Sequence, residues 1–191
     1  GNDPAATDAG LILASMMLDR GEYGPAATFA ALHLQHRDPS NVSAFRISAR
    51  AASNAKEYDT ARATLDNLRR VKGSEAAQAV ERAAVERAEK GNAAALGILE
   101  ASKLDLTDPA NEEVLRAMVE DLLVLKRSEA ALARVEAALA AHPESAPLLE
   151  LRAATLARAG RIADARAAFE KAGAADPEEP RPLIGLATLE A

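Results

Sequence analysis

Residues 156–177 read LARAGRIADARAAFEKAGAADP, and this stretch decides the architecture of the chain. Two earlier stretches end in the same way. LDLTDP closes at Pro109 and ALAAHP closes at Pro143, so these two prolines and Pro177 follow one another at intervals of 34 residues. A fixed period of about 20–50 residues is typical of a solenoid, in which each unit buries its apolar face only against its neighbours. The repeat therefore predicts a helical array and favours partner binding over catalysis.

Each unit is predicted to consist of two amphipathic helices joined by a short turn. In the clearest copy, the first helix covers 146–159 and Gly160 ends it, because glycine suits the left-handed conformation that closes helices. The second helix covers 162–174 and stops before Asp176-Pro177. No stretch of the chain shows a convincing strand pattern, so the prediction is an all-α fold.

Composition narrows the function classes. Alanine supplies 48 of the 191 residues and aromatic residues only 3%, which suits thin, closely packed helix pairs. The net charge of −6 argues against nucleic-acid binding. The absence of cysteine excludes disulfide and thiol chemistry and fits the bacterial periplasm and the cytoplasm equally, so the compartment stays open. No apolar run approaches the roughly 18–20 residues that a membrane span needs, so no direct membrane insertion is predicted.

The repeat resembles the tetratricopeptide repeat (TPR). That family places a small residue in the middle of the first helix, a glycine at the turn, and alanine, an aromatic residue, alanine and a closing proline in the second helix. The small residue of the first helix falls at Ala14, Ala49, Ala84, Val119 and Ala153, and that of the second helix at Ala26, Ala61, Leu96, Ala131 and Ala165. The resemblance covers nearly the whole chain, from about residue 7 to residue 190.

The resemblance implies a right-handed α-solenoid of five full units and a partial sixth. The units lie near 7–41, 42–76, 77–111, 112–145, 146–179 and 180–191, after a disordered tail at 1–6. Lys56 and Lys126 stand where the turn glycine is expected, and the third unit, with Leu96 and Gly97 in its small-residue region, is expected to pack irregularly. The incomplete sixth unit favours a fragment of a longer repeat protein over a capping helix.

The sequence contains no motif that predicts a catalytic or metal-binding site. The glycines are scattered singly, and no serine lies in a nucleophile turn, so no catalytic residue or cofactor is predicted. His33 and His36 are spaced i, i+3, but no third ligand accompanies them, and no metal site is predicted. We therefore expect a non-enzymatic protein.

The groove of the array is the predicted binding site. In the family that the chain resembles, the first helices line a concave face that holds a peptide. Residues 42–75 carry 7 basic and 4 acidic side chains, a basic island in an acidic chain. Arginine binds carboxylates bidentately, so an acidic peptide is a candidate ligand; the alternative is that Arg46 and Arg50 are solvated or pair with Glu81 on the next unit. The predicted groove residues are Arg46, Arg50, Asn54, Glu81, Arg116, Glu120 and Glu150.

These observations predict a protein-interaction scaffold that binds a peptide or a partner protein. Two alternatives belong to other classes. The alanine- and arginine-rich composition suggests a bacterial protein, and long arrays of this kind also look like periplasmic segments of exopolysaccharide export machines. The other alternative is a self-assembling scaffold, in which the open face of the sixth unit docks on a second copy of the chain.

Overall fold

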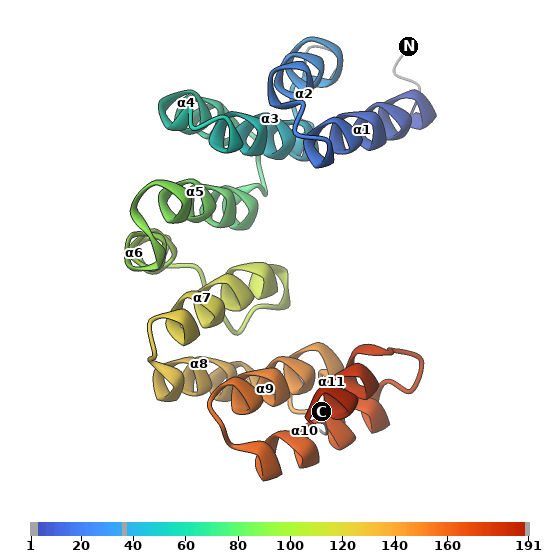
Figure 1. Ribbon diagram of the computed structural model, residues 1–191, viewed down its shortest axis with the longest axis vertical. Coiled ribbons are helices and arrows are strands. Elements are labelled where there is room, and N and C mark those ends of the chain that lie inside the picture. The colour runs from blue at the N-terminus through green and yellow to red at the C-terminus, as the bar shows by residue number, and fades with distance from the viewer. Residues whose placement is uncertain (1–3, 36–37, 190–191) are drawn as a thin grey trace. The chain divides into compact units, whose positions relative to one another are not determined.

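The computed structural model describes residues 4–35 and 38–189, and the side chains of residues 4–6 and 33–34 fall outside that description. The described chain is all-helical (Figure 1). The α-helices are α1 (Pro4–Asp19), α2 (Tyr23–Phe29), α3 (Val42–Asn54), α4 (Tyr58–Leu68), α5 (Glu75–Lys90), α6 (Asn92–Ala101), α7 (Glu112–Val124), α8 (Ser128–Ala141), α9 (Ala146–Arg158), α10 (Ile162–Ala175) and α11 (Arg181–Leu189). A π-helical segment, η1 (Ala30–Gln35), prolongs α2, and a 3-10 turn, η2 (Pro109–Asn111), precedes α7.

Contacts divide the chain into two compact units, Gly1–Ser102 and Lys103–Ala191. In the first compact unit α1 packs on α2, α3 on α4 and α5 on α6, and α3 also contacts α2 and α5. In the second compact unit α7 packs on α8 and α9 packs on α10. In addition, α8 contacts α9, and α11 lies on α10 and α9. These are the sequential helix pairs that the repeat predicts. The helix α1 begins at Pro4, three residues before the predicted start of the first unit.

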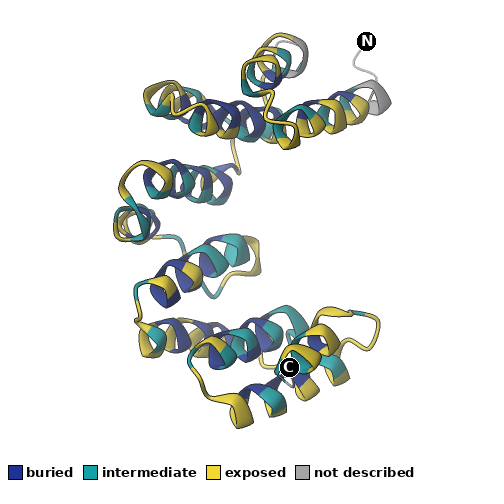
Figure 2. Ribbon diagram, viewed as in Figure 1, coloured by how far each residue is buried: buried dark blue, intermediate teal, exposed yellow. Residues whose placement is uncertain are grey.

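Burial confirms the positions at which small residues were expected between helices (Figure 2). In α9 and α10, Ala153 and Ala165 are fully buried, and they belong to a cluster that includes Leu156 and Phe169. Small side chains let two helices approach closely, and the larger residues around them fill the remaining space. Nine of the ten predicted positions are buried: Ala14, Ala26, Ala49, Ala61, Leu96, Val119, Ala131, Ala153 and Ala165.

The tenth position, Ala84, is only half-buried, and its neighbour Ala83 is fully buried. The buried positions of α5 match those of α9 when the third unit starts one residue earlier than predicted, at residue 76. The expected register of this unit was therefore wrong by one residue. In an α-helix one residue is a rotation of about 100°, so this shift changes which side chains face the groove.

The turns between paired helices explain how two lysines replace the expected glycine. Gly21, Lys56, Lys126 and Gly160 all have positive φ, between 60° and 78°. In each turn the amide three residues past the last residue of the helix donates to a carbonyl in the last turn of that helix, as Arg127 N donates to Leu122 O at 2.8 Å. This is the Schellman arrangement, and it forms whichever residue occupies the left-handed position.

The third unit has a different turn, although the sequence predicted that Gly91 would end its first helix as Gly160 ends that of the fifth unit. Gly91 both ends α5 and precedes α6, with φ 88° and ψ 176°, a region that is essentially open only to glycine. The turn between α5 and α6 is thus one residue long, whereas the other helix pairs use three. The boundary between the two compact units follows shortly after α6, at Ser102.

Candidate functional site

The first candidate surface is the face of α3 that carries Arg46, Arg50 and Asn54. The structure places both arginines against Glu81 of α5. Arg46 Nε donates to Glu81 Oε1 at 2.8 Å, and Arg50 donates from Nε to Oε2 at 2.9 Å and from Nη2 to Oε1 at 2.5 Å. Asn54 is exposed at the end of α3, and its side chain makes no hydrogen bond to the described residues. Of the two interpretations of this basic row, the structure shows the pairing with Glu81.

Glu81 was predicted to line the groove, and in the structure it is buried. Its side chain is only 2% exposed, whereas those of Arg46 and Arg50 are 27% and 54% exposed. The one-residue shift in register explains this burial, because Glu81 takes the place that Ile47 has in α3 and Leu151 has in α9, and both of these are buried. A carboxylate at such a position needs charged partners to offset the loss of water, and the two arginines supply them.

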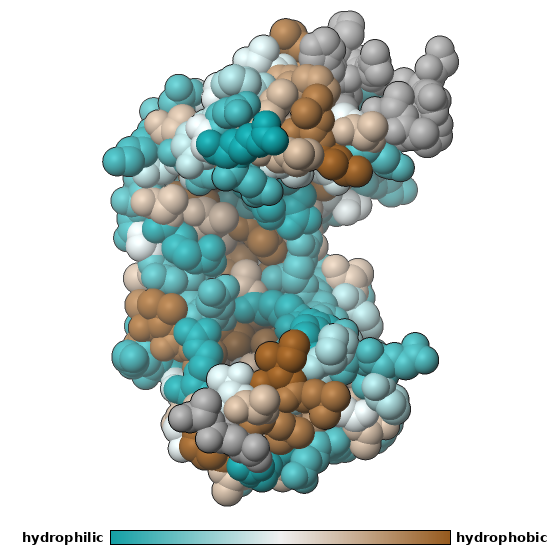
Figure 3. Space-filling view, turned by 45° about the vertical axis from the view of Figure 1, so that its right-hand side comes forward, coloured by the Kyte–Doolittle hydropathy of each residue, from teal (hydrophilic) through white to brown (hydrophobic). Residues whose placement is uncertain are grey.

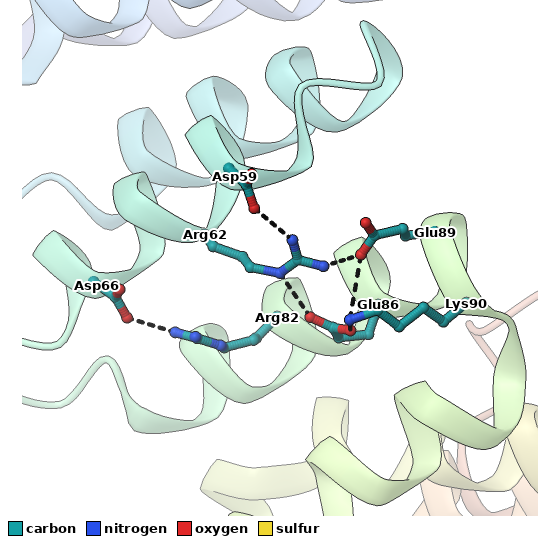
Figure 4. A network of polar contacts seen from close by, with 7 residues as sticks. All are labelled: Asp59, Arg62, Asp66, Arg82, Glu86, Glu89 and Lys90. Atoms are coloured by element: carbon teal, nitrogen blue, oxygen red, sulfur yellow. Dashed lines mark hydrogen bonds and ion pairs between the residues drawn. The ribbon is translucent and has the colours of Figure 1, made fainter.

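A second set of ion pairs links α4 to α5 (Figure 4). Arg62 donates to Glu86 at 2.8 Å and to Asp59 at 2.9 Å, and it also pairs with Glu89. Lys90 donates to Glu86 at 2.8 Å. The hydrogen bonds from Arg62 and Lys90 hold the pKa of the Glu86 carboxyl below its ordinary value, and Glu86 raises the pKa of Lys90. Arg82 and Asp66 pair along the same interface at 2.5 Å.

The second compact unit repeats the pairing between successive first helices. Arg116 of α7 donates to Glu112 at 2.7 Å, to Glu150 of α9 at 3.2 Å and to the Pro147 carbonyl at 3.0 Å. Glu150 also pairs with Arg181 of α11 at 3.2 Å. Arg116 and Glu150, both predicted groove residues, are therefore brought together as partners of one another.

A shallow cavity of about 290 Å³ lies between α7 and α9. Its charged lining includes Glu120 of α7 and Arg158 of α9, both exposed, and neither side chain bonds to another described residue. The apolar side chains of Leu123 and Ala154 also line the cavity. This is the face on which the sequence predicted a bound peptide. It combines apolar lining residues with two charged side chains that have no partner among the described residues. The remaining lining residues are Arg116, Val119, Leu151 and Thr155.

The run RRVK at 69–72 was not among the predicted groove residues. The side chains of Arg69, Arg70 and Lys72 are exposed and make no ion pair or hydrogen bond with the described residues. The signal was present in the composition, because these three cations supply much of the positive charge of residues 42–75. The positive charge was assigned instead to the two arginines of α3, which share the carboxylate of Glu81.

Within the described part of the chain, no three His, Cys, Asp or Glu side chains gather closely enough to hold a metal ion. The side chains of His33 and His36 lie outside the described residues. Among the described helices, none is both long and apolar enough to cross a membrane.

Comparison with solved structures shows the fold. A TPR protein from Thermus thermophilus superimposes with a TM-score of 0.63 at 17% identity, covering 96% of this chain and 98% of that one. PilW, a type IV pilus biogenesis factor, gives 0.58 at 18% identity, covering 100% of this chain and 92% of its own. YrrB, a TPR protein with an unusual peptide-binding site, gives 0.52 at 17% identity over 92% and 89%. The chain therefore has the fold of these TPR proteins.

No family model matches the sequence, and no curated protein matches it. The identities to the solved structures are low, so the likeness carries the architecture and leaves the binding partner to be argued from the side chains.

Proposed function

We propose that the protein is an interaction scaffold that binds a segment of a partner protein on the face formed by α7 and α9. The observation that carries the proposal is the cavity between these helices, where an apolar floor is flanked by the uncommitted charges of Glu120 and Arg158. An apolar side chain of the partner enters the cavity, and polar groups of the partner meet the two charges. Buried apolar anchors with polar groups at the rim are the usual anatomy of such interfaces.

The arginines of α3 play a smaller part in this proposal than the sequence suggested. Arg46 and Arg50 are bound to Glu81, so a ligand carboxylate would have to compete with a carboxylate already in place. Arg50 keeps about half of its side chain in solvent, and Asn54 is free to donate a hydrogen bond. We assign to this α3 surface an auxiliary contact with the partner.

The test uses peptides selected from a random phage-displayed library against the full chain. Ala154→Arg fills the cavity, and Ala167→Arg places the same side chain on the exposed face of α10. Selected peptides should lose at least about tenfold in affinity for Ala154→Arg and keep their affinity for Ala167→Arg. Circular dichroism checks that both variants retain their helices. Peptides that bind the two variants equally would place the binding surface elsewhere.

Self-association is a second candidate, supported by the outer face of α11. This helix packs Leu186 and Leu189 against α9 and α10, but Leu183 and Ile184 are 66% and 61% exposed. Figure 3 shows hydrophobic surface gathered over the C-terminal helices. Exposed apolar side chains in adjacent positions favour a protein contact. Light scattering should then give a mass above 20.0 kDa for the wild-type chain and the monomer mass after Leu183→Glu and Ile184→Glu.

A further inference from the structure

A second cavity, of about 810 Å³, lies in the first compact unit on the side of the second helices. It opens between η1, the segment before α3 and the chain that follows α4. Phe45, Val71 and Ala31 are its apolar lining, and Arg70 and Lys72 are its cations. The other lining residues are Gln35, Pro39, Ser40 and Asn67. No residue of this cavity belongs to the face of α7 and α9.

Most of the unpaired positive charge of residues 42–75 lies at this cavity. Of the seven basic residues in the segment, Arg46 and Arg50 pair with Glu81, and Arg62 pairs with three carboxylates. Within the described part of the chain, the side chains of Lys56, Arg69, Arg70 and Lys72 have no such partner. Three of these four lie in one run, 69–72, at the edge of the cavity.

Neighbouring acidic groups do not neutralise this run. Asp66 pairs with Arg82 at 2.5 Å. Asp38, which precedes the lining residues Pro39 and Ser40, accepts hydrogen bonds from the amide and hydroxyl of Ser40 at 2.9 Å and 2.6 Å and keeps its negative charge. The lining itself contains two cations, Arg70 and Lys72, and no carboxylate, so the cavity has an excess of positive charge.

The position of the run 69–72 just after α4 explains only some of its positive charges. Cations just past a helix are stabilised by the negative end of the helix dipole, and that effect falls off within the last turn. The helix dipole stabilises Arg69, which follows Leu68, the last residue of α4. It does not stabilise Lys72, which lies four residues after Leu68. A lysine on a polar, solvated loop would need no further explanation. Here, however, the apolar residues Val71 and Phe45 line the same cavity as Lys72.

We propose that this cavity binds an extended acidic segment of a partner protein. Carboxylates of the segment pair with Arg70 and Lys72, and an apolar side chain between them covers Val71. Arginine suits this role because its planar guanidinium binds a carboxylate through two hydrogen bonds. The cavity is far larger than an inorganic anion requires. Phe45 is only 7% exposed, so it offers no open ring face on which a nucleic-acid base could stack.

The test is a nuclear magnetic resonance titration of the full chain with a capped peptide in which glutamates flank a single leucine. The amides of Asn67 and Val71 should shift and saturate, whereas those of Glu120 and Ala154 should stay in place. Arg70→Glu with Lys72→Glu should weaken binding at least about tenfold, and Arg70→Gln should weaken it less. Binding should also weaken with added salt, because exposed charges are screened over about 8 Å at physiological ionic strength.

The matched control reverses two other adjacent cations, Lys126→Glu with Arg127→Glu, in the turn between α7 and α8. It makes the same change in net charge and should leave the affinity unaltered. Several results would overturn the proposal. These are no shift at Asn67 and Val71, equal losses in the two double variants, saturation of the same amides by inorganic phosphate alone, and tighter binding of an oligouridylate than of the peptide.

Discussion

Glu81 provides the sharpest test of how charge is used in this fold. The carboxylate is buried and accepts three hydrogen bonds from Arg46 and Arg50, whereas the two arginines retain contact with solvent. Removing the carboxylate therefore differs from removing the arginines. After Glu81→Leu the guanidinium groups can turn to water, and the leucine fills a position where α9 carries Leu151. We expect the free energy of unfolding to change by less than about 1 kcal/mol, because apolar replacement of a buried ion pair is often neutral.

Removing both arginines leaves the carboxylate buried without partners. Arg46→Leu with Arg50→Leu should then cost about 3–5 kcal/mol, which is the usual penalty for an uncompensated buried charge. Adding Glu81→Leu to this pair should restore most of the loss, so the three changes should be strongly non-additive. The measurement is urea unfolding followed by far-UV circular dichroism, compared through the midpoint and the slope of the transition.

Two results would refute this reasoning. One is a loss of less than about 1 kcal/mol for the double arginine variant, which would mean that water replaces the two arginines as partners of Glu81. The other is an equal loss of unfolding free energy for Glu81→Leu and for the double arginine variant. That result would mean that the hydrogen bonds between Glu81 and the arginines set the stability, and not the cost of burying an unpaired carboxylate. The same reasoning predicts that reversing Arg46 and Arg50 to glutamate destabilises the fold, so such variants are poor probes of ligand binding.

Three further predictions concern stability. Lys126→Gly should raise the free energy of unfolding by about 0.5–1 kcal/mol in urea titration, because Lys126 has φ 60° and glycine takes this conformation without strain. Ala153→Leu should lower it by about 1–3 kcal/mol through overpacking, whereas exposed Ala167→Leu should change it little. Glu86 has a lowered pKa in the folded state, so its contribution to stability is present above its ordinary value of 4.5 and is lost as the pH falls through the folded-state pKa; Glu86→Gln should flatten the acid dependence of the urea midpoint.

The period of the repeat was enough to predict the helix pairs. The starts of α3, α7 and α9 coincide with the predicted unit starts at Val42, Glu112 and Ala146. These boundaries were predictable because each has a local cause. Asn41 caps α3 by accepting a hydrogen bond from the Ala44 amide at 2.9 Å, and acidic residues begin α7.

The register of the third unit could not be predicted because the sequence is ambiguous there. Ala83 and Ala84 are adjacent and chemically identical, so either could fill the small-residue position. The choice depends on the single-residue turn at Gly91 and on the packing of α5 against α3 and α4, which are features of the assembled unit. The role of Glu81 follows from this choice, so its burial was equally out of reach.

The paired charges and the free charges of this protein have different roles. Arg46 with Glu81 joins the second unit to the third, and Arg116 with Glu150 joins the fourth to the fifth. In a repeat array each unit contacts only its neighbours, so charges that pair from one unit to the next help to fix how the units stack. Such pairs add little net stability over apolar residues, but a misplaced unit would leave a charge buried without a partner.

A ligand has to be held by charges that the fold has not already used. Among the described residues lining the two cavities, these are Glu120 and Arg158 at α7 and α9, and Arg70 and Lys72 beyond α4. Each set lies beside apolar side chains in a cavity, whereas Arg46 and Glu81 lie within a packed interface. The position of a charge in the repeat therefore does not decide whether it binds a partner. What decides it is whether the next repeat supplies a counter-charge, because only an unmatched charge gains a new partner when a ligand arrives.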